Sequence, residues 1–114
     1  SEVIEKAQSL YKKNSCYSKL HFMVGDVSHL PFNDNFFDMI LCESVLIFVS
    51  DKETAINEMF RVLKPFGYMG LNEIVANDSD YSLMQYFSRK EFLGYLINKN
   101  EFVELFNGHS VLLS

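Results

Sequence analysis

Cysteine is scarce in this sequence, and its two copies lie far apart. Cys16 sits in a polar stretch and Cys42 closes an apolar run, with no CxxC pair and no Cys/His cluster around either. This pattern predicts neither a zinc site nor a disulfide framework, so we expect no bound metal. A chain without disulfides is typical of a reducing compartment, and we expect a cytoplasmic one.

Basic residues and long apolar runs are also few. Lys and Arg number 10 against 15 Asp and Glu, which gives a formal net charge of −5. Nucleic acids and anionic membranes bind to basic faces, so we expect neither as a partner. No apolar run reaches the roughly 20 residues of a membrane-spanning helix. The first residues lack the apolar core of a secretory signal.

Hydrophobic residues are plentiful, at 48% of the chain, and include 11 Phe and 6 Tyr. A chain of 114 residues with this content can fill one core and suits one small domain. No repeat, low-complexity tract or linker divides it. We therefore expect a single domain over residues 1–114.

Apolar spacing and capping signals predict an alternation of strands and helices. Apolar residues recur at helical spacing from Glu2 to Lys13. A capping box, Ser50 to Glu53, predicts the start of a second helix, and Lys64–Gly67 its end. The segment Val45–Val49 fits either a strand or a short helical turn. The other expected elements are strands at Leu20–Val24, Phe36–Cys42 and Tyr68–Ile74, an excursion or lid at Val75–Phe87, a helix after a capping box at Ser88, and a hairpin of Glu101–Phe106 and His109–Leu113 around Asn107-Gly108.

This order predicts the fold class. Buried strands that alternate with capped helices favour an α/β fold, here a Rossmann-like three-layer sandwich with a mostly parallel sheet. The C-terminal hairpin is expected to add antiparallel pairing.

Three segments together resemble one family. They agree with it in order and spacing as well as in content, and the resemblance extends from Val3 to Phe106. The segments are Val24-Gly25-Asp26-Val27 with Leu30-Pro31-Phe32 and Asp34–Ile40, Val49-Ser50-Asp51 with Ala55-Ile56-Asn57-Glu58, and Arg61–Tyr68. The family that they resemble is the class I S-adenosylmethionine (SAM)-dependent methyltransferases of the small-molecule type, and the chain resembles the C-terminal two-thirds of their domain.

The resemblance implies SAM as the cofactor and gives cofactor roles to four residues. Asp26 would accept a hydrogen bond from the exocyclic amine of adenine, and the backbone of Val27 would reach a ring nitrogen. Cys42 and Glu43 would border the methionine end of the cofactor. For Asp26 the plainer alternative is that it only caps the turn after Gly25.

The resemblance also implies a small-molecule methyl acceptor, which the sequence does not identify. Ser44 and Glu73 follow predicted strands and could contact this substrate, or could simply be solvated strand ends. No catalytic residue is assigned. Methyl transfer from a sulfonium depends on alignment more than on acid–base help, so the absence of a catalytic triad does not count against the family.

The family opens with a strand, a glycine-rich turn, a helix and a second strand, and this sequence has no match for them. Its five glycines, at positions 25, 67, 70, 94 and 108, form no such turn. We therefore expect a fold that lacks the first two strands of the family, with a bare edge on Phe36–Cys42. We expect a homodimer or strand-swapped assembly through that edge. We also expect weak or absent SAM binding and no activity from this chain alone.

Two alternative functions come from other classes. A non-catalytic binding or dimerisation module derived from a methyltransferase would have a start codon at the first helix. An in-frame Glu/Asp-x-Gly-x-Gly-x-Gly segment upstream would instead favour the enzyme. A receiver-like or flavodoxin-like domain would need an acidic pair or a phosphate loop at its first strand, and the sequence shows neither.

Overall fold

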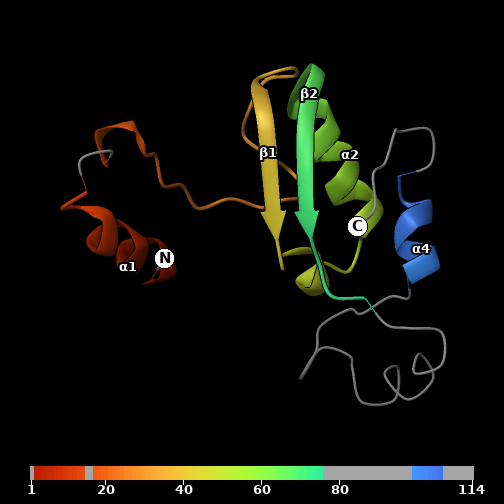
Figure 1. The fold of residues 1–114 in the computed structure, drawn as a ribbon, viewed down its shortest axis with the longest axis horizontal. Helices are drawn as coiled ribbons and strands as arrows, with labels where there is room; N and C mark the ends of the chain where they lie inside the picture. Colours follow the sequence, from red (N-terminus) through yellow and green to blue (C-terminus); the bar gives the residue numbers. More distant parts are fainter. Residues whose placement is uncertain (1, 15–16, 76–98, 107–114) are drawn as a thin grey trace.

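The centre of the molecule is a pair of parallel strands. A computed structural model describes residues 2–14, 17–75 and 99–106. Strand β1 (Phe37–Glu43) lies beside β2 (Leu63–Asn72) and runs in the same direction. The 3₁₀ helix η2 (Leu46–Phe48) and helix α2 (Lys52–Val62) join the two strands (Figure 1). Parallel neighbours need such a crossover, which confirms the expected parallel α/β arrangement for this part of the chain.

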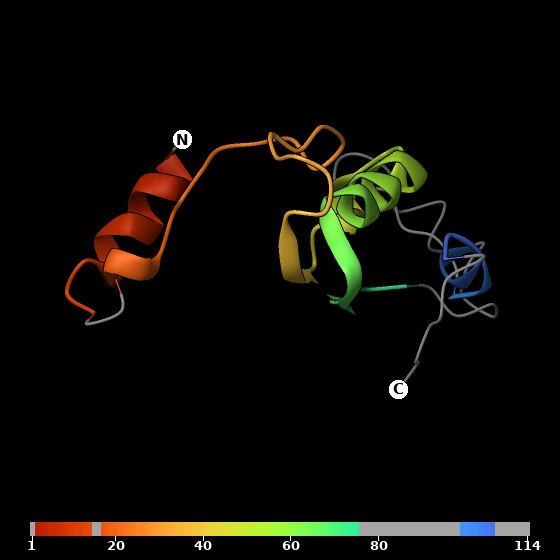
Figure 2. The same cartoon turned by 90° about the horizontal axis from the view of Figure 1, so that it is seen from above.

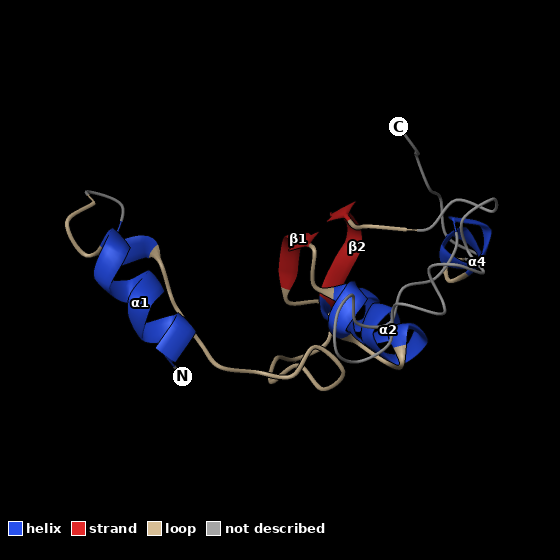
Figure 3. Ribbon diagram, turned by 90° about the horizontal axis from the view of Figure 1, so that it is seen from below, coloured by secondary structure: helices blue, strands red, loops and turns tan. Residues whose placement is uncertain are grey.

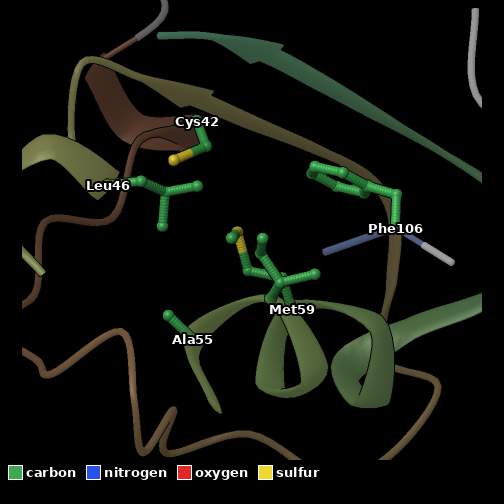
Figure 4. Packing of buried hydrophobic residues seen from close by; sticks show 6 residues of the cluster. Cys42, Leu46, Ala55, Met59 and Phe106 are labelled. Atoms are coloured by element: carbon green, nitrogen blue, oxygen red, sulfur yellow. The ribbon is translucent and has the colours of Figure 1, made fainter. Parts of the chain in front are cut away.

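Helix α2 covers one face of the strand pair. Ala55 and Ile56 are completely buried and Met59 is 3% exposed. Because strand side chains alternate, Ile40 and Cys42 both face this helix and pack into its core. Figures 2 and 3 show the helix on one side of the sheet, and Figure 4 shows Cys42 and Met59 converging. Full burial of a side chain such as Ile56 contributes about 1.5–3 kcal/mol.

The opposite face of the strand pair is exposed. Met39 and Leu41 on β1 are 56% and 77% exposed, and Tyr68 on β2 is 73% exposed. The register places Met39 beside Tyr68 and Leu41 beside Gly70. Leu41 leans over Gly70, where an added Cβ would lie only 2.8 Å from Leu41 Cδ2. This face is thus apolar and, among the described residues, uncovered.

Helix α1 (Glu2–Tyr11) lies apart from the strand pair (Figures 2 and 3). None of its residues is buried, and Val3 and Leu10 are more than 70% exposed. The short 3₁₀ helix η1 (Tyr17–Lys19) follows it. The expected strand Leu20–Val24 is wrong: this segment belongs to no ladder. A strand requires a hydrogen-bonded neighbour, and no described segment supplies one.

The structure also fixes the start of α2, the conformation of Val45–Val49 and the start of β2. The cap of α2 is Asp51 rather than Ser50, because the Asp51 carboxylate accepts the Thr54 backbone N–H at 3.0 Å. Val45–Val49 contains a helical turn, η2, and no strand. Strand β2 begins at Leu63, earlier than the expected Tyr68, because the chain passes directly from α2 into the ladder.

The expected C-terminal hairpin is also wrong in its first arm. Residues Lys99–Glu104 form helix α4, and Phe102 and Phe106 stack edge to face with ring centroids 5.4 Å apart. Phe102 and Phe106 are four positions apart, which is the spacing of one helical turn. Phe106 also contacts Phe60 of α2, so this spacing brings the two rings to the core. The second arm, the helix after Ser88 and all but the first residue of the lid lie outside the described residues. Within the described part, no helix has the length and apolarity to cross a membrane.

A charged clamp attaches the loop before β1 to helix α2. The Arg61 guanidinium donates to the carbonyl oxygens of Leu30 and Phe32, at 3.0 and 2.9 Å, and to the Asp34 carboxylate at 2.8 Å. It also makes two hydrogen bonds with Glu58, at 2.6 and 2.9 Å. These bonds use all five of its N–H donors. Glu58 in turn accepts the Leu30 backbone N–H at 2.8 Å.

The clamp predicts that the stability of the fold falls at low pH and that Glu58 contributes to this fall. Hydrogen bonds from Arg61 and from the Leu30 backbone hold the pKa of Glu58 at about 2 in the folded protein, against an ordinary value of 4.5. A lowered pKa stabilises the fold above pH 4.5, and that stabilisation is lost as the pH falls toward 2. We expect urea midpoints measured across this range to fall less steeply for Glu58→Gln than for the parent chain. The matched control is Glu53→Gln on the exposed side of α2, which should retain the parent slope; equal slopes for both variants would contradict the clamp.

Candidate functional site

The candidate site lies where the two parallel strands end. Their carboxyl ends, Glu43 and Asn72, are register partners and meet at one edge of the sheet, where ligands of open α/β folds bind. The Asn72 side-chain amide donates to Glu43 at 3.2 Å, and the Ser44 N–H donates to the Asn72 carbonyl at 2.7 Å. Ser44 has a φ of 54°, a left-handed conformation that turns the chain out of β1. Glu43 and Ser44 are both exposed at this tip.

Glu73 holds the turn that follows β1. Its Oε1 atom accepts the backbone N–H groups of Val45 and Leu46, each at 3.1 Å. These N–H groups open helix η2, where they have no partner within the helix. The other oxygen, Oε2, is buried, and no described group donates to it. Glu73 therefore has a structural role through one oxygen and keeps the second available for a donor.

Two buried titratable groups lie next to this turn. The Cys42 thiol donates to Glu73 Oε1 at 3.4 Å. Burial raises the pKa of the Cys42 thiol, and the hydrogen bond to Glu73 adds to this shift. Together they bring the pKa to about 11. Since the thiolate is the reactive form, Cys42 is an unreactive thiol at neutral pH. Lys52 is 7% exposed and donates to the Val49 carbonyl at 2.6 Å; burial lowers its pKa, and the negative charge of Glu73 opposes that shift.

Asp26 closes a tight turn in the loop that precedes β1. Its Oδ1 atom accepts the Ser28 N–H at 2.8 Å, and its carbonyl accepts the His29 N–H at 3.0 Å. The capping alternative raised from the sequence is therefore present in the structure. The side chain is exposed, and no described donor reaches Oδ2. One carboxylate oxygen thus shapes the loop and the other faces solvent.

Two cavities flank the loop that carries Val27. The first, which we name the loop cavity, has a volume of about 320 Å³ and includes Gly25 and Val27, the neighbours of Asp26. The second, the edge cavity, has a volume of about 330 Å³ and includes both Val27 and Cys42. Leu30 and Phe32 line both cavities. Glu43, Ser44 and Glu73 line neither.

The sequence interpretation missed the residues that hold this site in place. The Glu58–Arg61 clamp fixes Leu30 and Phe32, and Glu73 fixes the turn after β1. A signal existed for the clamp, because opposite charges three residues apart lie on one helix face. The bonds of Glu73 join residues 27 and 28 positions apart, and nothing in a local pattern indicates them. In the described part of the chain, no group of three or more His, Cys, Asp or Glu side chains could hold a metal ion.

The Glu73 contacts predict different effects for two substitutions. Glu73→Ala leaves the Val45 and Leu46 N–H groups without their acceptor and should lower the free energy of unfolding by about 1–3 kcal/mol. Glu73→Gln retains an oxygen acceptor and should cost less. The pKa of the Cys42 thiol should fall from about 11 by only part of its shift, because burial is the largest cause of the shift and is unchanged. Urea denaturation and the pH dependence of thiol alkylation measure the two effects. Equal stability of both variants, with unchanged thiol alkylation, would contradict this role.

Comparisons with known proteins agree with this geometry. Residues 1–71 match the family described as "Methyltransferase domain", which is more than half of the chain. Sterol 24-C-methyltransferase erg6 of Schizosaccharomyces pombe is 36% identical over 78 residues, which cover 68% of this chain and 20% of that protein. The chain thus spans about a fifth of the length of that curated relative.

Solved structures show the same fold. The YcgJ protein of Bacillus subtilis superposes with a TM-score of 0.81 at 27% identity, over 93% of this chain and 47% of that one. A SAM-dependent methyltransferase of Thermotoga maritima superposes with a TM-score of 0.60, also at 27% identity, over 75% of this chain and 43% of that one. The strand pair, its crossover helix and the matched sequence all agree. This chain belongs to the class I SAM-dependent methyltransferase family and represents part of its domain.

Proposed function

We propose that this chain supplies the adenine-binding portion of a methyltransferase that transfers a methyl group from SAM to a small-molecule acceptor. The observation that carries the proposal is the loop cavity, which the neighbours of Asp26 line together with Leu30, Pro31 and Phe32. An apolar wall beside a carboxylate suits a purine ring with an exocyclic amine. SAM supplies the activated methyl group, and the protein aligns it with the acceptor.

The residues fit one part of the cofactor better than the rest. Asp26 Oδ2 is available to the adenine amine, and the loop that carries it is held by the Ser28 N–H. Cys42 and Glu43 end strand β1, where we place the methionine portion of SAM. No described residue supplies the acidic group for the ribose or a glycine-rich turn. We therefore expect weak SAM binding and no turnover by this chain alone.

The acceptor side of the proposal rests on Ser44 and Glu73. Ser44 is exposed at the tip of β1. Glu73 has a buried oxygen, Oε2, with no described donor. A substrate hydroxyl or amine would satisfy that oxygen, so we place the polar group of the acceptor beside Glu73. The net charge of −5 favours a small molecule over a nucleic acid. The buried free thiol of Cys42 suits a reducing compartment, and we propose a cytoplasmic location.

A second function is a non-catalytic module derived from a methyltransferase. The apolar face of β1, which no described residue covers, favours it, because a binding module needs a surface and no cofactor. Both functions use the same fold, so fold similarity alone does not separate them.

Binding of SAM to the isotope-labelled chain, followed by NMR, tests the cofactor site. We expect a dissociation constant of about 1 mM or weaker, with shifts centred on the amides of Asp26, Val27, Cys42 and Glu43. Asp26→Ala should weaken binding by about tenfold, because it removes one hydrogen bond to the cofactor. The matched control is Asp38→Ala at the opposite end of β1, where Asp38 pairs with Lys64 at 3.0 Å.

The outcomes separate the two functions. Shifts at the four amides that Asp26→Ala weakens and Asp38→Ala leaves intact support the cofactor site. A folded chain with no shifts at any SAM concentration overturns the site and favours the module. Micromolar affinity would overturn the expectation that this portion alone binds weakly.

A further inference from the structure

The segment Leu30-Pro31-Phe32 forms a tight turn in the wall of the loop cavity. The Phe32 N–H donates to the Leu30 carbonyl oxygen at 2.8 Å, across Pro31, which is the pattern of a γ-turn. All three residues line the loop cavity. Pro31 also lies beside Gly25, since a Cβ added at Gly25 would be 3.9 Å from Pro31 Cδ. The turn is therefore next to the residue that precedes Asp26.

This turn depends on contacts from outside it for its shape. Its three residues belong to no helix and no strand, and one hydrogen bond joins its ends. A single hydrogen bond does not offset the conformational entropy that is lost when three residues become ordered. The polar groups that remain, the Leu30 N–H and the two carbonyl oxygens at its ends, are therefore the points at which the protein can fix the turn.

The clamp of Arg61 and Glu58 binds these points. Arg61 donates to the carbonyl oxygens of Leu30 and Phe32, at 3.0 and 2.9 Å. Glu58 accepts the Leu30 N–H at 2.8 Å, and two hydrogen bonds from Arg61 hold Glu58 in turn. Each backbone N–H and C=O group of Leu30 and Phe32 thus has a partner, and the clamp holds all of them except the Phe32 N–H.

The clamp residues stand behind the wall of the cavity. Both lie on α2, and neither is among the described residues that line the loop cavity. Any effect of Arg61 on a ligand there would pass through the turn. The planar guanidinium presents its five N–H groups to acceptors on several sides, whereas a lysine has one ammonium group that cannot reach them together. The position of this wall therefore depends on the shape of the Arg61 side chain as well as on its charge.

We infer that Arg61 is a positioning residue for the cofactor, which holds the Leu30-Pro31-Phe32 turn in the conformation that receives the adenine ring. Without the clamp, the turn would become ordered only when SAM binds, and the entropy lost in that ordering would lower the affinity. The inference rests on the proposed function, because it takes the loop cavity as the adenine site. It adds a residue that contacts no cofactor atom and still sets the affinity for SAM.

Binding of SAM to the 114-residue chain with Arg61→Lys, followed by NMR, tests this role. The variant keeps the positive charge and loses the planar fork. We expect SAM to bind about tenfold more weakly than to the parent chain, because the turn must then become ordered on binding. Without SAM, the amides of Leu30 and Phe32 should exchange faster relative to the ladder amides of β1. Circular dichroism verifies that the variant is folded.

Three further variants separate positioning from loss of charge and from loss of stability. Arg61→Ala and Lys64→Ala remove the same charge, and Lys64 pairs with Asp38 at 3.0 Å, away from the turn. Ile56→Val shortens a completely buried side chain and lowers the stability of the fold without contacting the turn. Arg61→Ala should weaken SAM binding at least as much as Arg61→Lys, whereas Lys64→Ala and Ile56→Val should leave the affinity within about twofold of the parent value. Glu58→Gln is a milder second variant of the clamp and should weaken binding to a smaller degree.

The parent chain separates this inference from the proposed function. Weaker SAM binding by Arg61→Lys, together with faster exchange in the turn, supports the positioning role. If the parent binds SAM and Arg61→Lys binds it as tightly, the inference is overturned and the proposed function stands. Equal weakening by Ile56→Val would also overturn it, because lost stability alone would then explain the effect. A parent chain that binds no SAM overturns the proposed function, and this inference with it.

Discussion

The packing of helix α2 onto the parallel pair β1–β2 is the interaction on which the rest of this structure depends. Ala55, Ile56 and Val62 are fully buried between the helix and the strands. Each strand alone would leave its backbone groups without partners, and the helix alone would expose its apolar face to water. Only the three together bury enough surface to offset the conformational entropy lost on folding. Contacts with this unit position the loops around the site.

Two sets of polar contacts attach loops near the candidate site to this unit. Arg61, from the last turn of α2, holds the Leu30–Asp34 loop through carbonyl and carboxylate oxygens. Glu73, just after β2, holds the turn after β1 through two backbone N–H groups. The Arg61 contacts thus hold a loop at the amino ends of the strands, and the Glu73 contacts hold a turn at their carboxyl ends. The residues proposed to contact the cofactor adjoin these segments, since Asp26 and Val27 precede Leu30, and Cys42 and Glu43 end β1.

The sequence predicted those parts of the fold that depend on local signals. The apolar run of β1 and the helical spacing of α2 are strong local patterns, and both elements are present. In contrast, Leu20–Val24 has the composition of a strand, but strand formation requires a neighbour at long range. The Asn107-Gly108 signal suggested a hairpin, whereas Glu101 to Glu104 are helical and Phe102 and Phe106 pack at helical spacing.

Site roles were less predictable than the fold. Asp26 was expected at a turn beside the cofactor, and its first oxygen caps that turn. Glu73 was expected to face a substrate, yet one of its oxygens is occupied by backbone N–H groups from the other strand end. Such contacts join residues far apart in the chain, so they follow from the register of the sheet and from no local pattern.

Amide hydrogen exchange measures the central claim most directly, because it reports the stability of each element separately. The account predicts the slowest exchange in α2 and in the ladder residues of β1 and β2, with a common free energy of opening. It predicts fast exchange in α1 and in Leu20–Val24, which bury nothing against that unit. Protection of α1 equal to that of β1 and α2 would contradict the claim that the crossover unit holds this structure together.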